Sequence, residues 1–274
     1  MKLLIFILFS SLVYASEQPI VPILYTLTHP QMPHKIIVLG SMHTKFKLSD
    51  FPEYIQKLLV SAHQIFLELN ETEEFKKFMP IDQPIQKDYF LKLINKHSLS
   101  DMLRDYSVTK PSAVDHEIGL LAYISGTPLH GLDDIIAHPH PKTDWMSILL
   151  QKIVLLVFRD QINKLQNAYQ NGEVEVIFDE LMTENDLRLQ DNISRESGWI
   201  GRILPKLTDT TLLNLVVVGV AHLKLGKNRF LTLFEEAGWN VEKFDHNNRR
   251  DVKTLNETLR VALLDITSRS TLTE

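Results

Sequence analysis

Short runs of aliphatic residues, separated by longer stretches with helical spacing, are the feature that most constrains the fold of this chain. The run Ile36–Leu39 is continuous, and Leu212–Val218 is interrupted only by Asn214; such apolar segments, rich in β-branched residues, are typical of strands buried on both faces of a sheet. Together with weaker runs, they predict strands at residues 36–39, 65–69, 128–132, 212–218 and 239–244. Strands that alternate with helices favour an α/β fold, with a mixed, mostly parallel central sheet and helices on both faces.

The helical stretches connect these strands and divide the chain in two. They cover residues 53–64, 115–125, 145–170, 173–193, 228–237 and 255–266. Because the first crossover is short, we expect the strands at 36–39 and 65–69 to be parallel and side by side. Two long helical stretches between the third and fourth strands predict a helical insertion over about residues 139–210. Short helices and loops are expected at residues 71–114, and a turn or loop at 138–141.

The first 15 residues predict an export signal. Lys2 precedes an apolar run, and Val13 and Ala15 occupy the −3 and −1 positions of a cleavage site. An uncleaved membrane anchor is the alternative, but the run is shorter than the roughly 20 apolar residues that span a bilayer. No cysteine follows the run, which excludes a lipoprotein anchor. We therefore expect a secreted or periplasmic protein with one domain over residues 16–274 and no membrane anchor after cleavage.

The composition narrows the chemistry that the chain can carry out. The absence of cysteine excludes disulfides, thiolate catalysis and cysteine-ligated zinc. Any metal must therefore be held by His, Asp, Glu or Asn. A formal net charge of −5 gives no reason to expect nucleic-acid binding.

Two predicted strands end in the same local pattern. Lys35–His43 and Asn214–His222 each consist of a polar residue, four aliphatic residues, a glycine, two variable residues and a histidine. Ligands of α/β sheets bind beyond the carboxyl ends of the strands, and a glycine there lets the backbone turn or approach a ligand closely. If the two strands are near neighbours, the imidazoles of His43 and His222 converge in one crevice.

A carboxylate joins this pair of histidines. Glu68 interrupts an otherwise apolar strand at the end that corresponds to the crevice, where an unpaired charge is costly. Two imidazoles and a carboxylate, from His43, His222 and Glu68, suit a divalent ion such as Mn, Co or Zn. Such an ion would lower the pKa of a bound water and polarise a carbonyl group. Without a metal, His43 and Glu68 would form a general-base pair, and an ion pair is the structural alternative for Glu68.

These motifs resemble those of the TraB/PrgY/GumN family, whose animal members are the TIKI proteases. Gly-Ser-Met-His, at residues 40–43, resembles the Gly-Thr-x-His start of the family, and Phe-Leu-Glu-Leu, at 66–69, resembles its strand with a single acid. The closing motif of the family resembles residues 217–223, followed by Gly226 and residues 235–239. Weaker similarities lie at 131–133, at 169–173 and at Asn185, so that the resemblance covers roughly residues 33–245 in the right order.

The resemblance implies a divalent-metal-dependent hydrolase, peptidase-like in its TIKI members, with His43, His222 and Glu68 as functional residues. It also points to Asp133 and Asn185 as supporting residues. The chain departs from the family at two positions. Glu184 precedes Asn185 where the family has Arg, and Arg188, one helical turn further on, is a candidate replacement. Asp133 is one methylene shorter than the glutamate of the family.

Three functions remain open on the sequence alone. The first is a metal-dependent hydrolase, a metalloprotease-like enzyme acting on peptides or on small esters and amides. The second is a metal-free esterase similar to erythromycin-esterase-type proteins, which chelators would not inhibit. The third is a non-catalytic binding protein for haem or for a peptide signal, which absorbance after haem addition would identify.

Overall fold

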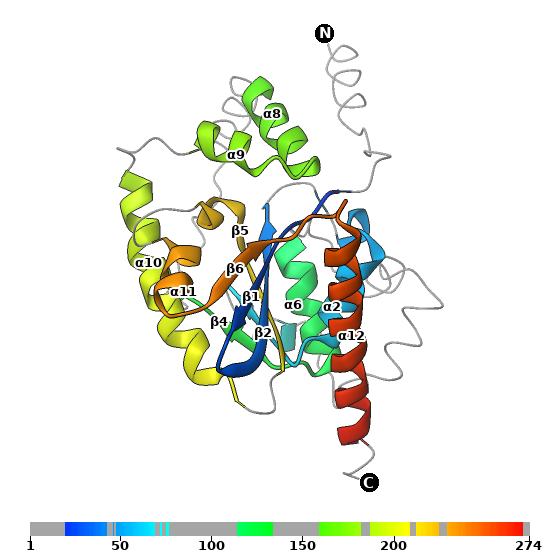
Figure 1. Ribbon diagram of the computed structural model, residues 1–274. Helices are drawn as coiled ribbons and strands as arrows, with labels where there is room; N and C mark the ends of the chain where they lie inside the picture. Colours follow the sequence, from blue (N-terminus) through cyan, green and yellow to red (C-terminus); the bar gives the residue numbers. More distant parts are fainter. Residues whose placement is uncertain are drawn as a thin grey trace.

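The computed structural model describes residues 20–42, 46, 48–68, 72, 75–76, 114–133, 159–181, 187–208, 212–224 and 229–270. Within these residues, six strands form one sheet in the order β4-β3-β5-β2-β1-β6 (Figure 1). The strands are β1 (Ile23–His29), β2 (Met32–Ser41), β3 (Gln64–Leu67), β4 (Leu129–Gly131), β5 (Leu213–Gly219) and β6 (Asn240–Lys243).

The predicted α/β fold with a mixed, mostly parallel sheet is confirmed. The pairs β4-β3, β3-β5 and β5-β2 are parallel, whereas β1 pairs antiparallel with both β2 and β6. One expectation is wrong, because β2 and β3 are parallel but β5 lies between them. Residues 213–218 of β5 are all buried, and a strand that is apolar on both faces is stable only at the centre of a covered sheet.

The sequence pattern missed β1 altogether. This strand alternates aliphatic residues with Thr26 and Thr28, and it forms a hairpin with β2 in which only Pro30 and Gln31 separate the two strands. An alternating, partly polar strand is typical of an antiparallel pair with one exposed face. It therefore lacks the continuous apolar run that marks β2 and β5.

Helices cover both faces of the sheet, as predicted. The described α-helices are α2 (Glu53–Ser61), α6 (Val114–Ser125), α8 (Arg159–Gln170), α9 (Val174–Leu181), α10 (Leu187–Ile203), α11 (Phe230–Glu236) and α12 (Arg249–Ser270). Three short 3-10 helices are η1 (Leu48–Asp50), η2 (Leu204–Lys206) and η3 (Val220–Leu223). Helices α2, α6 and α12 lie on one face, and α10 and α11 lie on the other (Figure 1).

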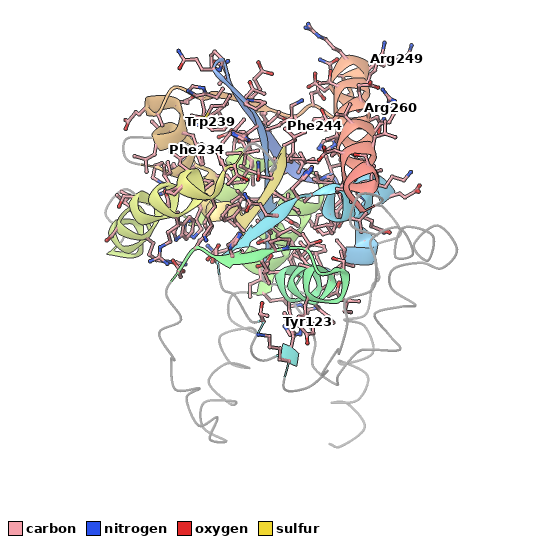
Figure 2. All side chains as sticks on the ribbon, turned by 90° about the horizontal axis from the view of Figure 1, so that it is seen from below. Tyr123, Phe234, Trp239, Phe244, Arg249 and Arg260 are labelled. Carbon is pink, nitrogen blue, oxygen red and sulfur yellow. The ribbon has the colours of Figure 1, made fainter. Side chains whose placement is uncertain are left out.

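Two of the described helices differ clearly from the prediction. The predicted helix over 173–193 corresponds to two elements, α9 and α10, and α10 continues to Ile203. The last helix is longer than expected at both ends, and Asn248 begins it by accepting a hydrogen bond from the backbone N–H of Arg250 at 2.9 Å. Arg249 and Arg260 extend from α12 away from the sheet (Figure 2).

Aromatic side chains fill the core beside α11. Phe230 and Phe234 pack edge to face at 5.2 Å, and Phe234 packs against Trp239 at 5.9 Å. Figure 2 shows Phe234 and Trp239 on the side of the molecule opposite Tyr123 of α6. Gly238 ends α11 with a φ of 87°, the left-handed conformation that releases the chain into β6.

Several sequence predictions lie outside the described residues. These are the export signal over residues 1–15, most of the segment 71–114, the turn at 138–141 and the first part of the helical stretch at 145–170. The described parts of the predicted insertion, residues 159–181 and 187–208, carry α8, α9 and α10. Over the described ranges, none of the helices combines the length and the apolar character needed to cross a bilayer.

Candidate functional site

At the candidate site, the carboxyl ends of three parallel strands lie next to one helix, α10. Glu68 follows β3, Asp133 follows β4, and His222 lies in η3 directly after β5. The strand ladder continues past both acids, because the backbone N–H of Asp133 donates to the carbonyl of Glu68 at 2.9 Å. From the other side, α10 contributes Arg195 and Glu196.

Glu68 lies close to a histidine and also forms an ion pair, the two alternatives that the sequence predicted for it. Its Oε1 accepts a hydrogen bond from the backbone N–H of Gly219 at 2.5 Å, and its Oε2 lies 3.0 Å from Nη2 of Arg195. His222 Nε2 lies 3.6 Å from Oε1. The side chain is only 14% exposed, so these contacts replace most of the water that a surface carboxylate would bind.

Arg195 joins the two strand-end acids. Its Nε donates to both carboxylate oxygens of Asp133, at 3.3 and 3.1 Å, and its Nη2 reaches Asp133 as well as Glu68. Trp199, one helical turn further on, donates from Nε1 to Asp133 at 2.7 Å, and the guanidinium lies over its ring at 5.3 Å. Burial acts to lower the pKa of Arg195, but the hydrogen bonds and the charges of Asp133 and Glu68 raise it above the ordinary arginine value.

His222 is held from behind by a buried ion pair. Its Nδ1 lies 2.7 Å from Oε1 of Glu196, a side chain with no exposed surface. The same carboxylate binds Nη2 and Nε of Arg229 at 2.8 and 3.0 Å, and it accepts the backbone N–H of Phe230 at 2.7 Å. A carboxylate paired with arginine is an acceptor only. Nδ1 of His222 therefore donates to Glu196, and Nε2 faces Glu68.

Gly40, the glycine of the first motif, lets that motif pack tightly against the second. A Cβ atom at Gly40 would lie 2.7 Å from Cδ1 of Leu223, the residue after His222. Along the β2-β5 pair, Gly40 lies opposite Val218 and Ser41 lies opposite Gly219. The two strand ends are therefore direct neighbours, the condition under which the sequence predicted that their histidines converge.

The described residues bring together three of the predicted site residues, Glu68, Asp133 and His222. His43 and Asn185 lie outside the described residues, and so does the side chain of Arg188, whose backbone belongs to α10. Among the described side chains, Arg195 is the arginine that lies beside the acids.

Four further residues of the site were not predicted: Arg195, Glu196, Trp199 and Arg229. The predicted helix ends at Ile193, so the prediction places none of these residues on its buried face. With the helix continued, Glu196, Trp199 and Ile203 recur at helical spacing, and each is at most 1% exposed. A glutamate on such a buried face needs a charged partner, and this was the signal that could have found it.

A divalent ion fits two of the described side chains. Two ligand atoms on a tetrahedral ion with bonds of about 2.1 Å lie roughly 3.4 Å apart, and Nε2 of His222 and Oε1 of Glu68 are 3.6 Å apart. The contact of Nδ1 with Glu196 is the outer support that metal-bound imidazoles usually have. Among the described residues, no group of three or more His, Asp or Glu side chains could hold a metal by itself. A third ligand would have to come from elsewhere, and His43 is the predicted one.

Comparisons with family models, with curated proteins and with solved structures find no match to this chain. The likeness to the TraB/PrgY/GumN family therefore rests on its motifs alone.

Proposed function

We propose that this chain is an exported TraB/GumN-like hydrolase of peptide bonds or of small esters and amides, with His222 and Glu68 at its reacting centre. The observation that carries the proposal is the orientation of His222. Its Nδ1 is fixed on the buried carboxylate of Glu196, and its Nε2 faces Glu68 at 3.6 Å, at the edge where α/β sheets bind ligands.

Each residue of the site has a separate role in the proposed hydrolysis. Glu196 keeps the imidazole in one orientation and stabilises any positive charge that it gains. Nε2 of His222 and Oε1 of Glu68 form the basic pair that holds or accepts the proton of a water molecule. Arg195 is fixed by two carboxylates, yet its side chain is 39% exposed. It supplies positive charge next to the position where a carbonyl oxygen becomes negative.

A divalent metal, Mn, Co or Zn, is part of the leading form of the proposal. His222, Glu68 and His43 would hold it. When bound there, the metal would lower the pKa of a water ligand and polarise the carbonyl group of the substrate.

A metal-free acid–base mechanism is the second candidate, and the ion pair of Glu68 with Arg195 at 3.0 Å favours it. Among the described residues, the three carboxylates of the site face two guanidinium groups, which leaves a single negative charge. In this form Glu68 and His222 act as the general-base pair of an esterase.

The test is hydrolysis measured by mass spectrometry in water enriched in oxygen-18. The chain is treated with a chelator and then supplied with Mn, Co or Zn, and the substrates are a mixture of unstructured peptides and a simple aryl ester. Oxygen-18 in new carboxyl groups identifies hydrolysis. Activity that returns only with metal supports the first mechanism, and activity that survives the chelator supports the second.

The variants His222→Gln and Glu68→Gln are expected to lose at least about a hundredfold in rate, the size of a general acid–base contribution. The matched control is His63→Gln. His63 also pairs with a carboxylate, Asp265 at 2.8 Å, but it lies before β3, at the opposite end of the strand. Wild-type rates in both site variants would reject the assignment, as would an equal loss in the control.

A further inference from the structure

A second polar cavity lies on the α12 face of the sheet, far from the candidate site. It has a volume of about 290 Å³ and lies between α12 and the antiparallel strands β2, β1 and β6. Lys35 is six residues before Ser41 in β2, which places it roughly 20 Å from the end of the strand where the candidate site lies. The two sites therefore share a strand but not an opening.

The walls of the cavity carry hydroxyl groups and charges. The lining residues that matter here are Thr26, Lys35, Thr254 and Thr258, with Arg250 from the first turn of α12. Thr26 and Lys35 come from the sheet, whereas the other three come from the helix. Hydroxyl and ammonium donors thus surround the cavity from both sides.

Lys35 is a half-buried cation without a counter-ion in the described part of the chain. Its Nζ donates to Oγ1 of Thr258 at 2.8 Å, and the hydroxyl of Thr258 donates in turn to the carbonyl of Thr254 at 2.8 Å. No described carboxylate lies within 4.0 Å of this ammonium. Burial lowers the pKa of Lys35 below the ordinary lysine value, which is the effect expected of a charge that has lost water and gained only a neutral partner.

An anion in the cavity would supply what Lys35 lacks. An ammonium has three donors, and Thr258 takes only one of them. Two donors remain for an oxyanion, and the hydroxyls of Thr26 and Thr254 can complete its shell, because the hydroxyl of Thr258 already donates to a carbonyl. Asp251 lines the cavity as well, with its Oδ2 accepting the backbone N–H of Asp245 at 3.1 Å, and its charge disfavours ligands that carry several negative charges. Glu242 also lines the cavity and disfavours a polyanion, so the fitting ligand is small.

We propose that the cavity between α12 and β2 binds the carboxylate or phosphate group of a small polar molecule, with Lys35 as its principal contact. The site does not depend on the hydrolase proposed above. Its ligand is recognised by charge-assisted hydrogen bonds from Lys35 and by the hydroxyl groups around it.

The experiment is calorimetric titration of the full chain with inorganic phosphate and, separately, with acetate. Binding of phosphate alone identifies a phosphate site, and binding of acetate alone identifies a carboxylate site. Lys35→Met, which keeps the length of the side chain but removes its charge, is expected to raise the Kd of the bound anion at least roughly tenfold. Thr258→Val, which removes only the hydroxyl that positions Lys35, is expected to raise the Kd severalfold.

The matched control is Lys253, on the outer side of the same helix. Lys253 lines the outer surface together with Arg249 and Arg260, so Lys253→Met makes the same change of charge outside the cavity. The Kd of the anion for this variant should stay within about twofold of the wild-type value, since an exposed charge outside the cavity is largely screened. The proposal is overturned if neither anion binds the wild-type chain, or if Lys35→Met and Lys253→Met change the Kd equally.

Discussion

Glu196→Gln is the most informative single substitution in the described chain. The side chain has no exposed surface, and it pairs with Arg229, whose own side chain is only 4% exposed. Glutamine keeps the shape but removes the charge, so the buried guanidinium loses its ion pair with Glu196. Breaking a buried ion pair in this way costs about 3–5 kcal/mol in the free energy of unfolding. For a domain of this size, that corresponds to a fall in Tm of roughly 6–20 °C.

The assay is urea denaturation of wild type, Glu196→Gln, Arg229→Met and the double variant. The double variant removes both charges, so it is expected to recover a large part of the loss, and the cycle measures the coupling between the two side chains. A loss below about 1 kcal/mol in Glu196→Gln, or full additivity in the double variant, would refute the argument. The substitution should also reduce hydrolysis, because a glutamine amide can donate to Nδ1 of His222 and move the proton to Nε2.

Three further predictions follow from other contacts. Gly40→Ala is expected to lower the free energy of unfolding by about 1–3 kcal/mol, because the new Cβ would lie 2.7 Å from a methyl group of Leu223. In the same urea denaturation assay, Gly201→Ala should be neutral or stabilising, because no atom lies within 4 Å of its new Cβ. Tyr169→Phe removes the hydroxyl that donates to the carbonyl of Gly40 at 2.8 Å and should cost about 1–3 kcal/mol, whereas an unchanged urea midpoint would contradict it. Burial lowers the pKa of His246 in the folded chain, so the free energy of unfolding should fall as the pH drops below the pKa of an unfolded histidine. Burial raises the pKa of Tyr25 to about 12, so the free energy of unfolding should also fall as the pH rises from about 10 to 12. Tm values that stay constant at both ends of this pH range would contradict the prediction.

The sequence allowed most of the parallel sheet to be predicted, because its strands are continuous apolar runs. The order of the strands in the sheet could not be predicted from the sequence. Burial on both faces marks β5 as a covered strand, but it does not say which strands are its neighbours, and β5 proved to lie between β2 and β3. Strand β1 was not predicted because Thr26 and Thr28 interrupt its apolar pattern. It pairs with β2 in a hairpin and with β6 on its other side.

The candidate site was predictable only as far as a local pattern marked it. Glu68 and His222 stand out because each interrupts or ends an apolar run. Their partners on α10 lie far away along the chain: Glu68 and Arg195 are 127 residues apart, and His222 and Glu196 are 26 apart. Such pairings depend on how helices pack on the sheet, and no spacing within the sequence encodes them.

The measurement that tests the central claim most directly is titration of the full chain with Co, followed by visible absorption. If His222 and Glu68 hold a metal with His43, wild type and His63→Gln should bind one ion with the absorption of a tetrahedral or five-coordinate site. The variants His222→Gln, Glu68→Gln and His43→Gln should each lose it. Equal binding in all five proteins, or no binding in wild type, would contradict a metal centre at this edge of the sheet.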